Sequence, residues 1–418
     1  MFGKKQPEVL VVGAGPVGLT AALVLARRGV RVKIVDEAWR PTTHAYALAL
    51  HPQALDLLER LELASPVLDK AERVLGLGVY AGSKRMARLD LGRGGGAFPF
   101  VAVLRQSVLE ELLVAALAKH HVEVEWNHRL ARLRQAPDHV DVTIDKLEKD
   151  QVGYAVMHTS WCVADSHDWK PSFVIGADGH ASLVRRRLEV EFPEVGRAQH
   201  FAVFEFGTDF DFEHELRLVL RTTDANVVWP LPDGRCRWSF ELPGYDDPGD
   251  QREKTRHVFE LGSGRYPILE EKNLYSLLEE RAPWFDGKVD EIDWRLVVRF
   301  ERRLATSFGH GRAWLAGDAG HMTSPVGIQS MNVGLREVDE LANLIADELA
   351  GAQRADGFAA YGEARLHEWR RLLGVDGRDP ATDDTPKWLR PFAPDLLPAL
   401  PASGPGLAEL ARQLGLRC

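Results

Sequence analysis

The 418-residue chain has little cysteine and no long hydrophobic run. Its cysteines (Cys162, Cys236 and Cys418) are widely spaced and form no CxxC pair, which argues against a disulfide framework and against a zinc or other metal site. No apolar run approaches the about 20 residues of a membrane span, and the first residues lack the apolar core of a signal peptide. We therefore expect a cytoplasmic protein without a membrane span. The net charge of −9 argues against a nucleic-acid partner.

The strongest local pattern lies in residues 8–36. An apolar run at 9–12, typical of a buried parallel strand, leads into the GxGxxG spacing, an apolar helix and a second strand that ends at Asp36. In such a unit the glycines form a tight turn, admit a pyrophosphate and let helix and strand pack closely, while the acid binds a ribose hydroxyl. A ligand-free glycine turn would need none of these flanking features. We expect a dinucleotide at Gly13, Gly15, Pro16, Val17, Gly18, Asp36 and Glu37.

Two further strand ends carry glycine and aspartate. The first, Gly-Ala-Asp178-Gly179, precedes a short basic helix, although Asp-Gly after a strand is also a common turn. The second is Gly317-Asp318, followed by a loop with Pro325 and a helix that starts near Ser330. An acid at a strand end can hold ribityl or ribose hydroxyls, and the N-terminus of a helix stabilises the negative charge of a reduced flavin.

In this order and at these separations the three motifs resemble the class A FAD-dependent monooxygenases, the p-hydroxybenzoate hydroxylase-like aromatic hydroxylase family. The resemblance covers roughly residues 7–350. It implies that Asp178 and Gly179 serve FAD and transient NAD(P)H binding, and that Pro325, the one catalytic candidate, lies beside the isoalloxazine. The other FAD contacts that it implies are Arg105, Gln106, Gly317, Asp318, Gly327, Ser330, Met331 and Asn332.

The resemblance implies hydride transfer from NADH or NADPH to FAD, a flavin hydroperoxide formed with O2, and hydroxylation of an aromatic or phenolic, even polyketide-like, small molecule. A single GxGxxG leaves no second dinucleotide unit, and the resemblance implies that the nicotinamide cofactor binds transiently. A flavin-dependent reductase or halogenase on the same scaffold is an alternative, although no WxWxIP-like motif or clear active-site lysine supports the halogenase. A non-catalytic flavin-binding protein that sequesters an intermediate is a third reading. The chain is expected to be a monomer or homodimer.

The sequence departs from the family at several positions. Where many members read Gly-Gly-Gln-Gly-Met-Asn, this chain has Ile328 and Ser330 in place of two glycines, which keeps the sequestering alternative open. His44 replaces an arginine expected near the pyrophosphate, Gly320 replaces an alanine, and Glu337 replaces an aspartate. We also expect no thioredoxin-like C-terminal domain of the kind that larger relatives carry.

The predicted fold is α/β: a Rossmann-like FAD-binding domain of the glutathione-reductase type with an inserted β-sheet substrate domain and C-terminal helices. The expected boundaries are 1–75, 98–187 and 285–350 for the discontinuous FAD-binding domain, 76–97 and 188–284 for the substrate-binding sheet, and 351–418 for the helical tail. A helix is expected near 251–262.

Substrate contacts are less well defined by the sequence. Aromatic residues of the 198–243 strands are candidate pocket walls, but at strand spacing such residues more often form core; they are Phe204, Phe206, Trp229 and Trp238. Polar side chains there could bind a phenol or carboxylate, and none stands out among His200, Glu205, Arg217, Arg221 and Arg237. His321 is expected to be a structural partner near FAD rather than a base. The arginines at 185–187 could bind NAD(P)H phosphates or form a solvated face.

Overall fold

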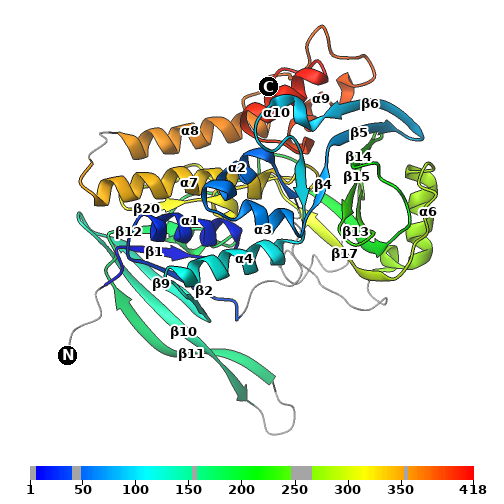
Figure 1. Cartoon of the computed structure of the whole chain (residues 1–418). Helices are drawn as coiled ribbons and strands as arrows, with labels where there is room; N and C mark the ends of the chain where they lie inside the picture. The colour runs from blue at the N-terminus through cyan, green and yellow to red at the C-terminus, as the bar shows by residue number, and fades with distance from the viewer. Residues whose placement is uncertain (1–5, 40–48, 153–157, 246–265, 353–355) are drawn as a thin grey trace.

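A computed structural model describes residues 6–39, 49–152, 158–245, 266–352 and 356–418 (Figure 1). His44 and the helix expected near 251–262 lie outside these residues. Among the described residues, no helix is both long enough and apolar enough to cross a membrane.

A six-stranded sheet carries the glycine motifs. Its order is β19 (Gly309–His310), β20 (Ala313–Leu315), β12 (Phe173–Gly176), β1 (Val9–Val12), β2 (Val32–Asp36) and β8 (Val124–Trp126). All neighbours pair in parallel except β19 with β20. Because parallel strands end at the same edge, the chain segments after β1, β2, β12 and β20 meet there.

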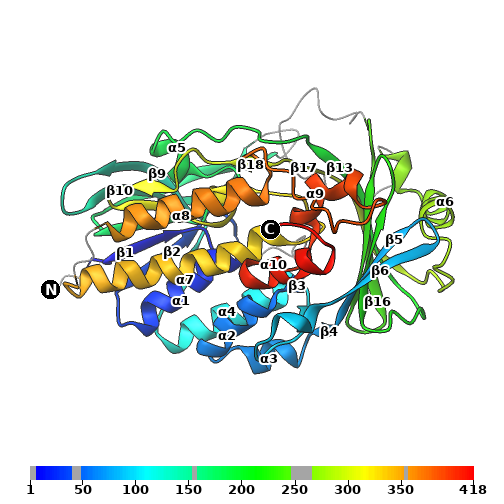
Figure 2. The ribbon, with the colours of Figure 1, turned by 90° about the horizontal axis from the view of Figure 1, so that it is seen from above.

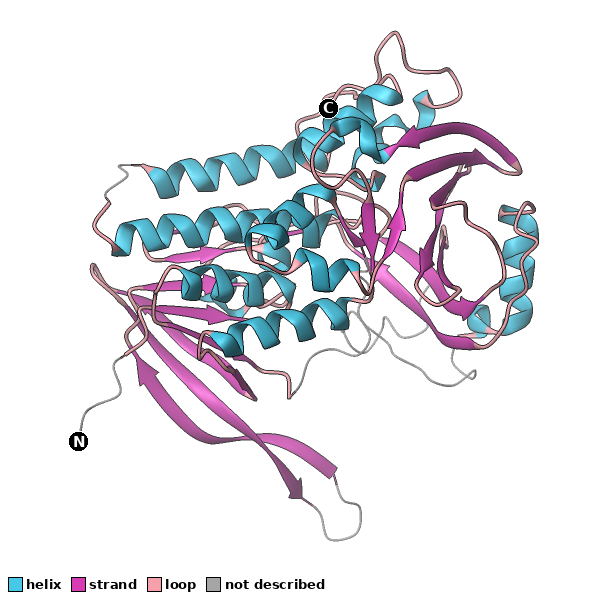
Figure 3. Ribbon diagram, in the orientation of Figure 1, coloured by secondary structure: helices cyan, strands magenta, loops and turns pink. Residues whose placement is uncertain are grey.

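Other elements pack on both faces of this sheet. The residues of β1 are therefore all apolar instead of alternating between apolar and polar. Val9 and Val11 pack in one apolar cluster with the helices, and Leu10 and Val12 pack in another with the strands of a three-stranded antiparallel sheet. Figure 3 shows the helices gathered on one side and this sheet on the other. The helices are α1 (Pro16–Arg27), α2 (Pro52–Arg60), α3 (Ala64–Leu68), α4 (Gln106–Lys119), α7 (Gln329–Leu349) and α8 (Gly357–Leu372). The strands are β9 (His128–Gln135), β10 (Val140–Val152) and β11 (His158–Trp169), followed in the chain by α5 (Leu183–Arg187).

A second, seven-stranded sheet stands beside the first layer. Its order is β17 (Ile292–Phe300), β13 (Gln199–Gly207), β16 (Arg235–Glu241), β15 (Ala225–Leu231), β14 (Glu215–Leu220), β5 (Gly76–Ala81) and β6 (Lys84–Asp90). Seen from above, it lies between α6 (Glu271–Arg281) and the remaining helices (Figure 2). Together the two sheets form the α/β arrangement that the sequence predicts, whereas the exact domain boundaries stay a prediction.

The two faces of the seven-stranded sheet correct part of the substrate-pocket interpretation. Phe204, Phe206 and Trp238 are fully buried in the apolar cluster that includes α6. Trp229 is also buried but belongs to the cluster of the opposite face, together with the first sheet and its helices. The first three residues are therefore core of the α6 face, because strand alternation turns them away from the glycine motifs.

Smaller elements join the two layers. Two short sheets contain β3 (Ala49–Leu50), β7 (Val101–Val103) and β4 (Glu72–Val74), and β18 (Arg303–Leu304) with β21 (His321–Met322). The chain ends with short helices that include α9 (Ala393–Leu396) and α10 (Gly404–Gln413), and Figure 1 places them above the junction of the two layers.

Candidate cofactor and active site

The three glycine and aspartate motifs converge at one edge of the parallel sheet. A Cβ added to Gly13 would lie 2.2 Å from the carbonyl oxygen of Ala177 and 2.8 Å from the Cα of Asp178. A Cβ added to Gly317 would lie 3.1 Å from Cγ2 of Val17. The first motif therefore contacts both of the others, although 164 and 304 residues separate Gly13 from Ala177 and Gly317.

The GxGxxG glycines differ in what surrounds them. Gly13 has a φ of +103°, a conformation that L side chains rarely adopt, and a Cβ on Gly18 would lie 1.9 Å from the Gly13 carbonyl oxygen. Gly15, at the N-cap of α1, has no neighbouring atom within 4 Å of an added Cβ. The first and third glycines are thus required by packing, whereas the second faces open space at the N-terminus of a helix, where a phosphate fits.

Carboxylates gather beside this turn. Asp36 accepts hydrogen bonds from the backbone N–H groups of Ala14 (2.6 Å) and Ala38 (2.7 Å), and burial raises its pKa despite these bonds. Burial also raises the pKa of Glu37, and the neighbouring Asp36 and Asp178 raise it further. Carboxylate oxygens accept hydrogen bonds, so the side chains of Asp36 and Glu37 suit hydroxyl donors such as those of a ribose.

Asp178 is engaged within the second motif itself. Its carboxylate accepts hydrogen bonds from the Ser182 hydroxyl (2.5 Å) and from the backbone N–H groups of Leu183 (2.7 Å) and Val184 (3.1 Å). Burial raises the pKa of Asp178, and the hydrogen bond from Ser182 opposes that rise. The side chain holds the first turn of α5, while Gly179 beside it faces open space; the predicted cofactor contacts of both stay a prediction.

The third motif presents Asp318 from an otherwise buried turn. Asp318 is exposed, whereas Gly317 and Ala319 on either side are buried. An exposed acid at this edge fits the predicted role of holding ribityl hydroxyls. The replacement of alanine at Gly320 also has a steric reason, because an added Cβ would lie 2.8 Å from the ring of Phe308.

Glu337 fixes that turn from α7. Its Oε2 accepts hydrogen bonds from the Gly317 backbone N–H (3.0 Å) and from His321 Nε2 (2.9 Å), and its Oε1 accepts one from Trp369 Nε1 (2.8 Å). The His321 ring stacks on Trp369 with centroids 3.7 Å apart. Burial alone would raise the pKa of Glu337, but His321 and these hydrogen bonds hold it below its usual value. His321 is thus a buried structural partner, as the sequence predicts, while the contribution of Trp369 had no sequence signal.

The loop at 325–328 adopts a glycine-like shape in spite of its isoleucine. Pro325 is half-buried, and Ile328 forms the N-cap of α7 with a left-handed backbone, φ 51° and ψ 40°. A β-branched residue rarely adopts that region. The exchange of glycine for Ile328 has therefore left the backbone in glycine's conformation, and the free N–H groups of the first turn of α7, which includes Ser330 and Met331, remain available.

The side chain of Asn332 holds the same loop through hydrogen bonds. It accepts a hydrogen bond from the backbone N–H of His51 (2.7 Å) and donates to the carbonyl oxygens of Ala49 (2.9 Å) and Ile328 (2.8 Å). The His51 ring hydrogen-bonds the Gly327 carbonyl through Nε2 at 2.9 Å, and burial lowers the pKa of His51 to about 3. The ring is therefore neutral at physiological pH.

The C-terminal segment covers this loop from another side. A Cβ on Gly327 would lie 2.5 Å from the Pro398 carbonyl oxygen. The side-chain amide of Gln329 donates to the carbonyl oxygens of Leu400 (2.6 Å) and Ala402 (2.5 Å). No sequence pattern predicted that residues 397–402 lie beside this loop.

Arg105 and Gln106 lie at the start of α4, and Arg105 connects the two layers. Gln106 donates to Glu110 at 2.7 Å. The guanidinium of Arg105 binds Glu205 of β13 at 2.5 Å, and Glu205 also binds Arg237 at 2.7 Å. Burial would raise the pKa of Glu205, but the two arginines hold it below its usual value. The predicted flavin contacts of Arg105 and Gln106 stay a prediction; the structure places Arg105 at the interface with the seven-stranded sheet.

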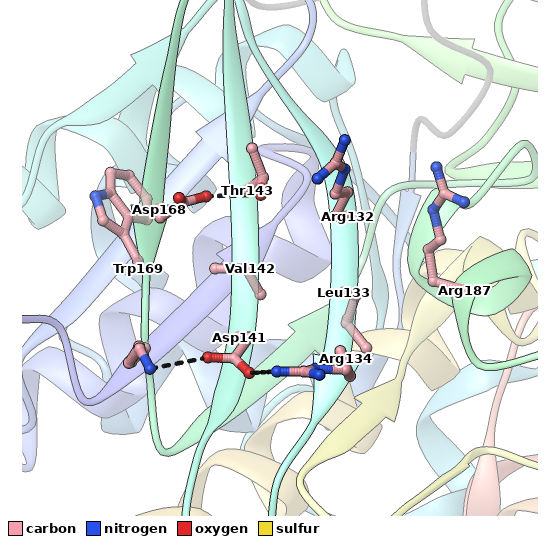
Figure 4. A pocket seen from close by; sticks show the side chains of 10 residues that line it. Arg132, Leu133, Arg134, Asp141, Val142, Thr143, Asp168, Trp169 and Arg187 are labelled. Carbon is pink, nitrogen blue, oxygen red and sulfur yellow. Dashed lines mark hydrogen bonds and ion pairs between the residues drawn. The ribbon is translucent and has the colours of Figure 1, made fainter.

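An open groove of about 570 Å³ lies elsewhere, on the three-stranded sheet (Figure 4). Among its charged residues Asp141 binds Arg134 (2.9 Å) and Lys170 (3.2 Å), and these partners lower the pKa of Asp141 to about 2. None of the predicted FAD-binding residues lines it. We therefore do not assign the cofactor to this groove.

Relatives of known activity match most of this chain. It is 31% identical over 375 residues to a 6-methylpretetramide 4-monooxygenase of Streptomyces rimosus, an alignment that covers 88% of this chain and 60% of that protein. It is 27% identical over 377 residues to a pentachlorophenol 4-monooxygenase of Sphingobium chlorophenolicum, covering 87% of this chain and 63% of that protein. The chain thus spans about three fifths of the length of these two relatives.

Solved structures share the fold. A p-nitrophenol 4-monooxygenase from Pseudomonas putida superposes with a TM-score of 0.71 at 20% identity, covering 98% of this chain and 94% of the other. An aklavinone-11 hydroxylase, solved with FAD and aklavinone, gives a TM-score of 0.64 at 22% identity, covering 99% of this chain and 70% of the other.

The family model described as "FAD binding domain" matches residues 6–374, a span that includes the three converging motifs. The chain therefore belongs to the FAD binding domain family.

Proposed function

We propose that the chain is an FAD-dependent monooxygenase that uses NADH or NADPH and O2 to hydroxylate an aromatic or phenolic, polyketide-like small molecule. The observation that carries this proposal is the convergence of three distant motifs on one sheet edge, where Gly15 faces open space and Asp318 is exposed. The named activities of the relatives on a pretetramide and a chlorophenol favour an aromatic substrate.

The residues at this edge fit an FAD molecule. The N-terminus of α1 offers backbone N–H groups and open space for the pyrophosphate. The carboxylates of Asp36 and Glu37 suit a ribose, Asp318 suits the ribityl hydroxyls, and the start of α7 offers N–H groups to a negatively charged pyrimidine edge.

When bound, FAD supplies the redox and oxygen-activating chemistry, and the chain supplies binding, orientation and a dry site. Glu337 holds the Asp318 turn through the Gly317 N–H, and Asn332 holds the loop at Ile328. The face of the seven-stranded sheet that carries Val203 and Leu296 belongs to the same apolar cluster as the first layer and excludes water from the junction. No side chain is assigned as a general base.

The test starts with purified full-length protein. We expect it to bind FAD, to oxidise NADH or NADPH faster when a suitable phenol or aromatic polyketide is added, and to insert one atom from isotopically labelled O2 into the product. Asp318→Ala should weaken FAD binding, whereas Asp339→Ala, which removes an ion pair between α7 and Arg60 of α2, should not. Protein that stays colourless with FAD would contradict the proposal.

Two other outcomes would identify the alternatives. Oxidation of NAD(P)H with saturation of a substrate double bond and no oxygen insertion would indicate a reductase. FAD binding with almost no reduction by either nicotinamide, whatever ligand is present, would indicate a sequestering protein, the reading that Ile328 and Ser330 keep open.

A further inference from the structure

Arg217 of β14 is a nearly buried arginine that has no counter-ion among the residues that the structure describes. Its side chain is 7% exposed, and within the described ranges it makes no hydrogen bond and no ion pair. Its guanidinium carbon lies 4.6 Å from the ring centroid of Trp284, 4.8 Å from that of Phe210 and 5.7 Å from that of Tyr80. Arginine stays protonated in proteins, and this guanidinium has no anionic partner among the described residues, so an anion that reaches its terminal nitrogens would meet an unpaired positive charge.

Further donors without acceptors lie in the same ring cluster. The buried Nε1 atoms of Trp238 and Trp284 have no hydrogen-bond partner in the described part of the chain, and neither has the Nε of Arg217. The rings of Trp238 and Trp284 lie 5.8 Å apart. A buried N–H without an acceptor is destabilising, so several such groups in one cluster favour a ligand that supplies an acceptor.

The carboxylate on the same face of β14 is not the counter-ion of Arg217. Glu215, two residues earlier, is fully buried and pairs with Arg85 and Arg88 of β6. It makes no ion pair with Arg217. The stretch therefore holds three arginines against one glutamate, which leaves an excess of positive charge.

This cluster lies apart from the proposed flavin site. Arg217 and Trp238 both pair with Val228 across β15, so the two side chains project from the α6 face of the seven-stranded sheet. Figure 2 shows α6 on the side of this sheet away from the glycine motifs. Trp284 and Phe210 are half-buried, so the cluster reaches the protein surface.

We propose that Arg217, with the indole N–H groups of Trp238 and Trp284, binds the carboxylate of a small aromatic acid at a second site on the α6 face. The planar guanidinium matches a carboxylate through paired hydrogen bonds. The rings of Tyr80, Phe210 and Trp284 supply flat apolar surface for the aromatic body. This site is independent of the proposed hydroxylation.

The test uses the full chain loaded with FAD, with benzoate as the probe and neutral benzamide as its isostere. We expect benzoate to quench tryptophan fluorescence saturably and to leave the visible absorption of the flavin unchanged. Benzamide should bind at least about tenfold more weakly, because it cannot form the charge-assisted pair. Trp284→Phe should remove most of the quench, whereas Trp161→Phe on the distant β11 should not.

Variants separate binding from packing. Arg217→Met should weaken benzoate binding about tenfold or more. Arg217→Lys keeps the charge but loses the paired hydrogen bonds of the guanidinium, so its affinity should lie between those of the wild type and Arg217→Met. Arg73→Met is the matched control, because Arg73 also stacks on a ring, that of Phe100, outside the cluster. Arg217→Met and Arg73→Met both lose a cation–π contact, so their unfolding midpoints without benzoate should change in the same direction.

Three results would overturn the proposal. In the first, benzoate changes neither the tryptophan signal nor the unfolding midpoint. In the second, the quench keeps its full affinity in Arg217→Met. In the third, the flavin spectrum changes with the same affinity as the quench. The last result would place benzoate beside the flavin instead.

Discussion

His321 Nε2 lies 2.9 Å from Glu337 Oε2, and neither side chain has any exposed surface. The pair connects the turn that carries Asp318 to the middle of α7. Because the same Glu337 oxygen also accepts the Gly317 backbone N–H, this carboxylate sets the position of the acid that we assign to the ribityl chain.

Glu337→Gln should lower the free energy of unfolding by about 3 kcal/mol, a cost typical of removing one partner of a buried ion pair. The amide keeps the volume but lacks the charge that His321 faces, and one of its two ends can no longer accept a hydrogen bond. Urea unfolding followed by circular dichroism measures the change. Glu340→Gln, on the same helix and exposed, should change stability by no more than about 0.5 kcal/mol, and equal effects of the two variants would contradict the assignment.

The same carboxylate should make stability depend on pH. Its pKa is lower in the folded chain than its usual value of 4.5, because His321 and the hydrogen bonds outweigh burial. This contribution is therefore fully present above pH 4.5 and is lost as the pH falls through the lower, folded-state pKa. Asp36 and Asp178, whose pKa values are raised, act in the opposite direction. The wild-type minus Glu337→Gln difference in unfolding free energy, measured on acidification, should shrink; a constant difference would rule out this linkage.

The glycines of the first motif should separate folding from cofactor binding. Gly18→Ala should destabilise the chain, because the new Cβ would lie 1.9 Å from the Gly13 carbonyl oxygen. Gly15→Ala should unfold like the wild type in the absence of FAD, because no protein atom lies within 4 Å of its Cβ. It should nevertheless bind FAD at least about tenfold more weakly, because the methyl group enters the space of the pyrophosphate. Flavin fluorescence titration measures this affinity, and unimpaired binding would remove the pyrophosphate from this turn.

Ile328 allows a test of backbone strain. Both Ile328→Ala and Ile328→Gly lose the buried side chain, but only glycine is free of the penalty for a left-handed backbone. The glycine variant should therefore be the more stable of the two by about 1 kcal/mol. At an ordinary position alanine is the more stable, so the reverse order in urea unfolding would show that this backbone is not left-handed in solution.

Local patterns in the sequence predicted much of the fold, including the strand ends that carry the three glycine and aspartate motifs. The strand, turn and helix at 9–27 have a regular period and fixed glycine spacing, and the alternating strands near 198–243 are also visible. The face on which Phe204 and Trp238 lie could not be predicted, because alternation shows that faces differ but not which partner covers each one. Contacts of long sequence separation, such as that of Trp369 with Glu337, leave no local pattern.

The hydrogen bonds between Gln329 and the C-terminal segment are also contacts of long sequence separation. A final prediction concerns them. Gln329 is fully buried, and its amide holds the carbonyl oxygens of Leu400 and Ala402. Gln329→Leu keeps the size of the side chain but removes this donor from both carbonyl oxygens. The Leu400 carbonyl oxygen keeps its bond from the Ala402 N–H, so the expected cost is that of one buried acceptor, about 1–3 kcal/mol.

Because these bonds hold one end of the segment, the loss should appear first as local opening of residues 397–418 rather than as global unfolding. Limited proteolysis and amide hydrogen exchange should show faster reaction in that segment, with α1 and α4 unchanged. Gln135→Leu is the matched control, since Gln135 bonds His310 and the Arg312 backbone N–H and lies outside residues 397–418. Equal exchange in the Gln329→Leu variant and the wild type would mean that apolar packing alone seats the C-terminal segment on the loop at Gly327.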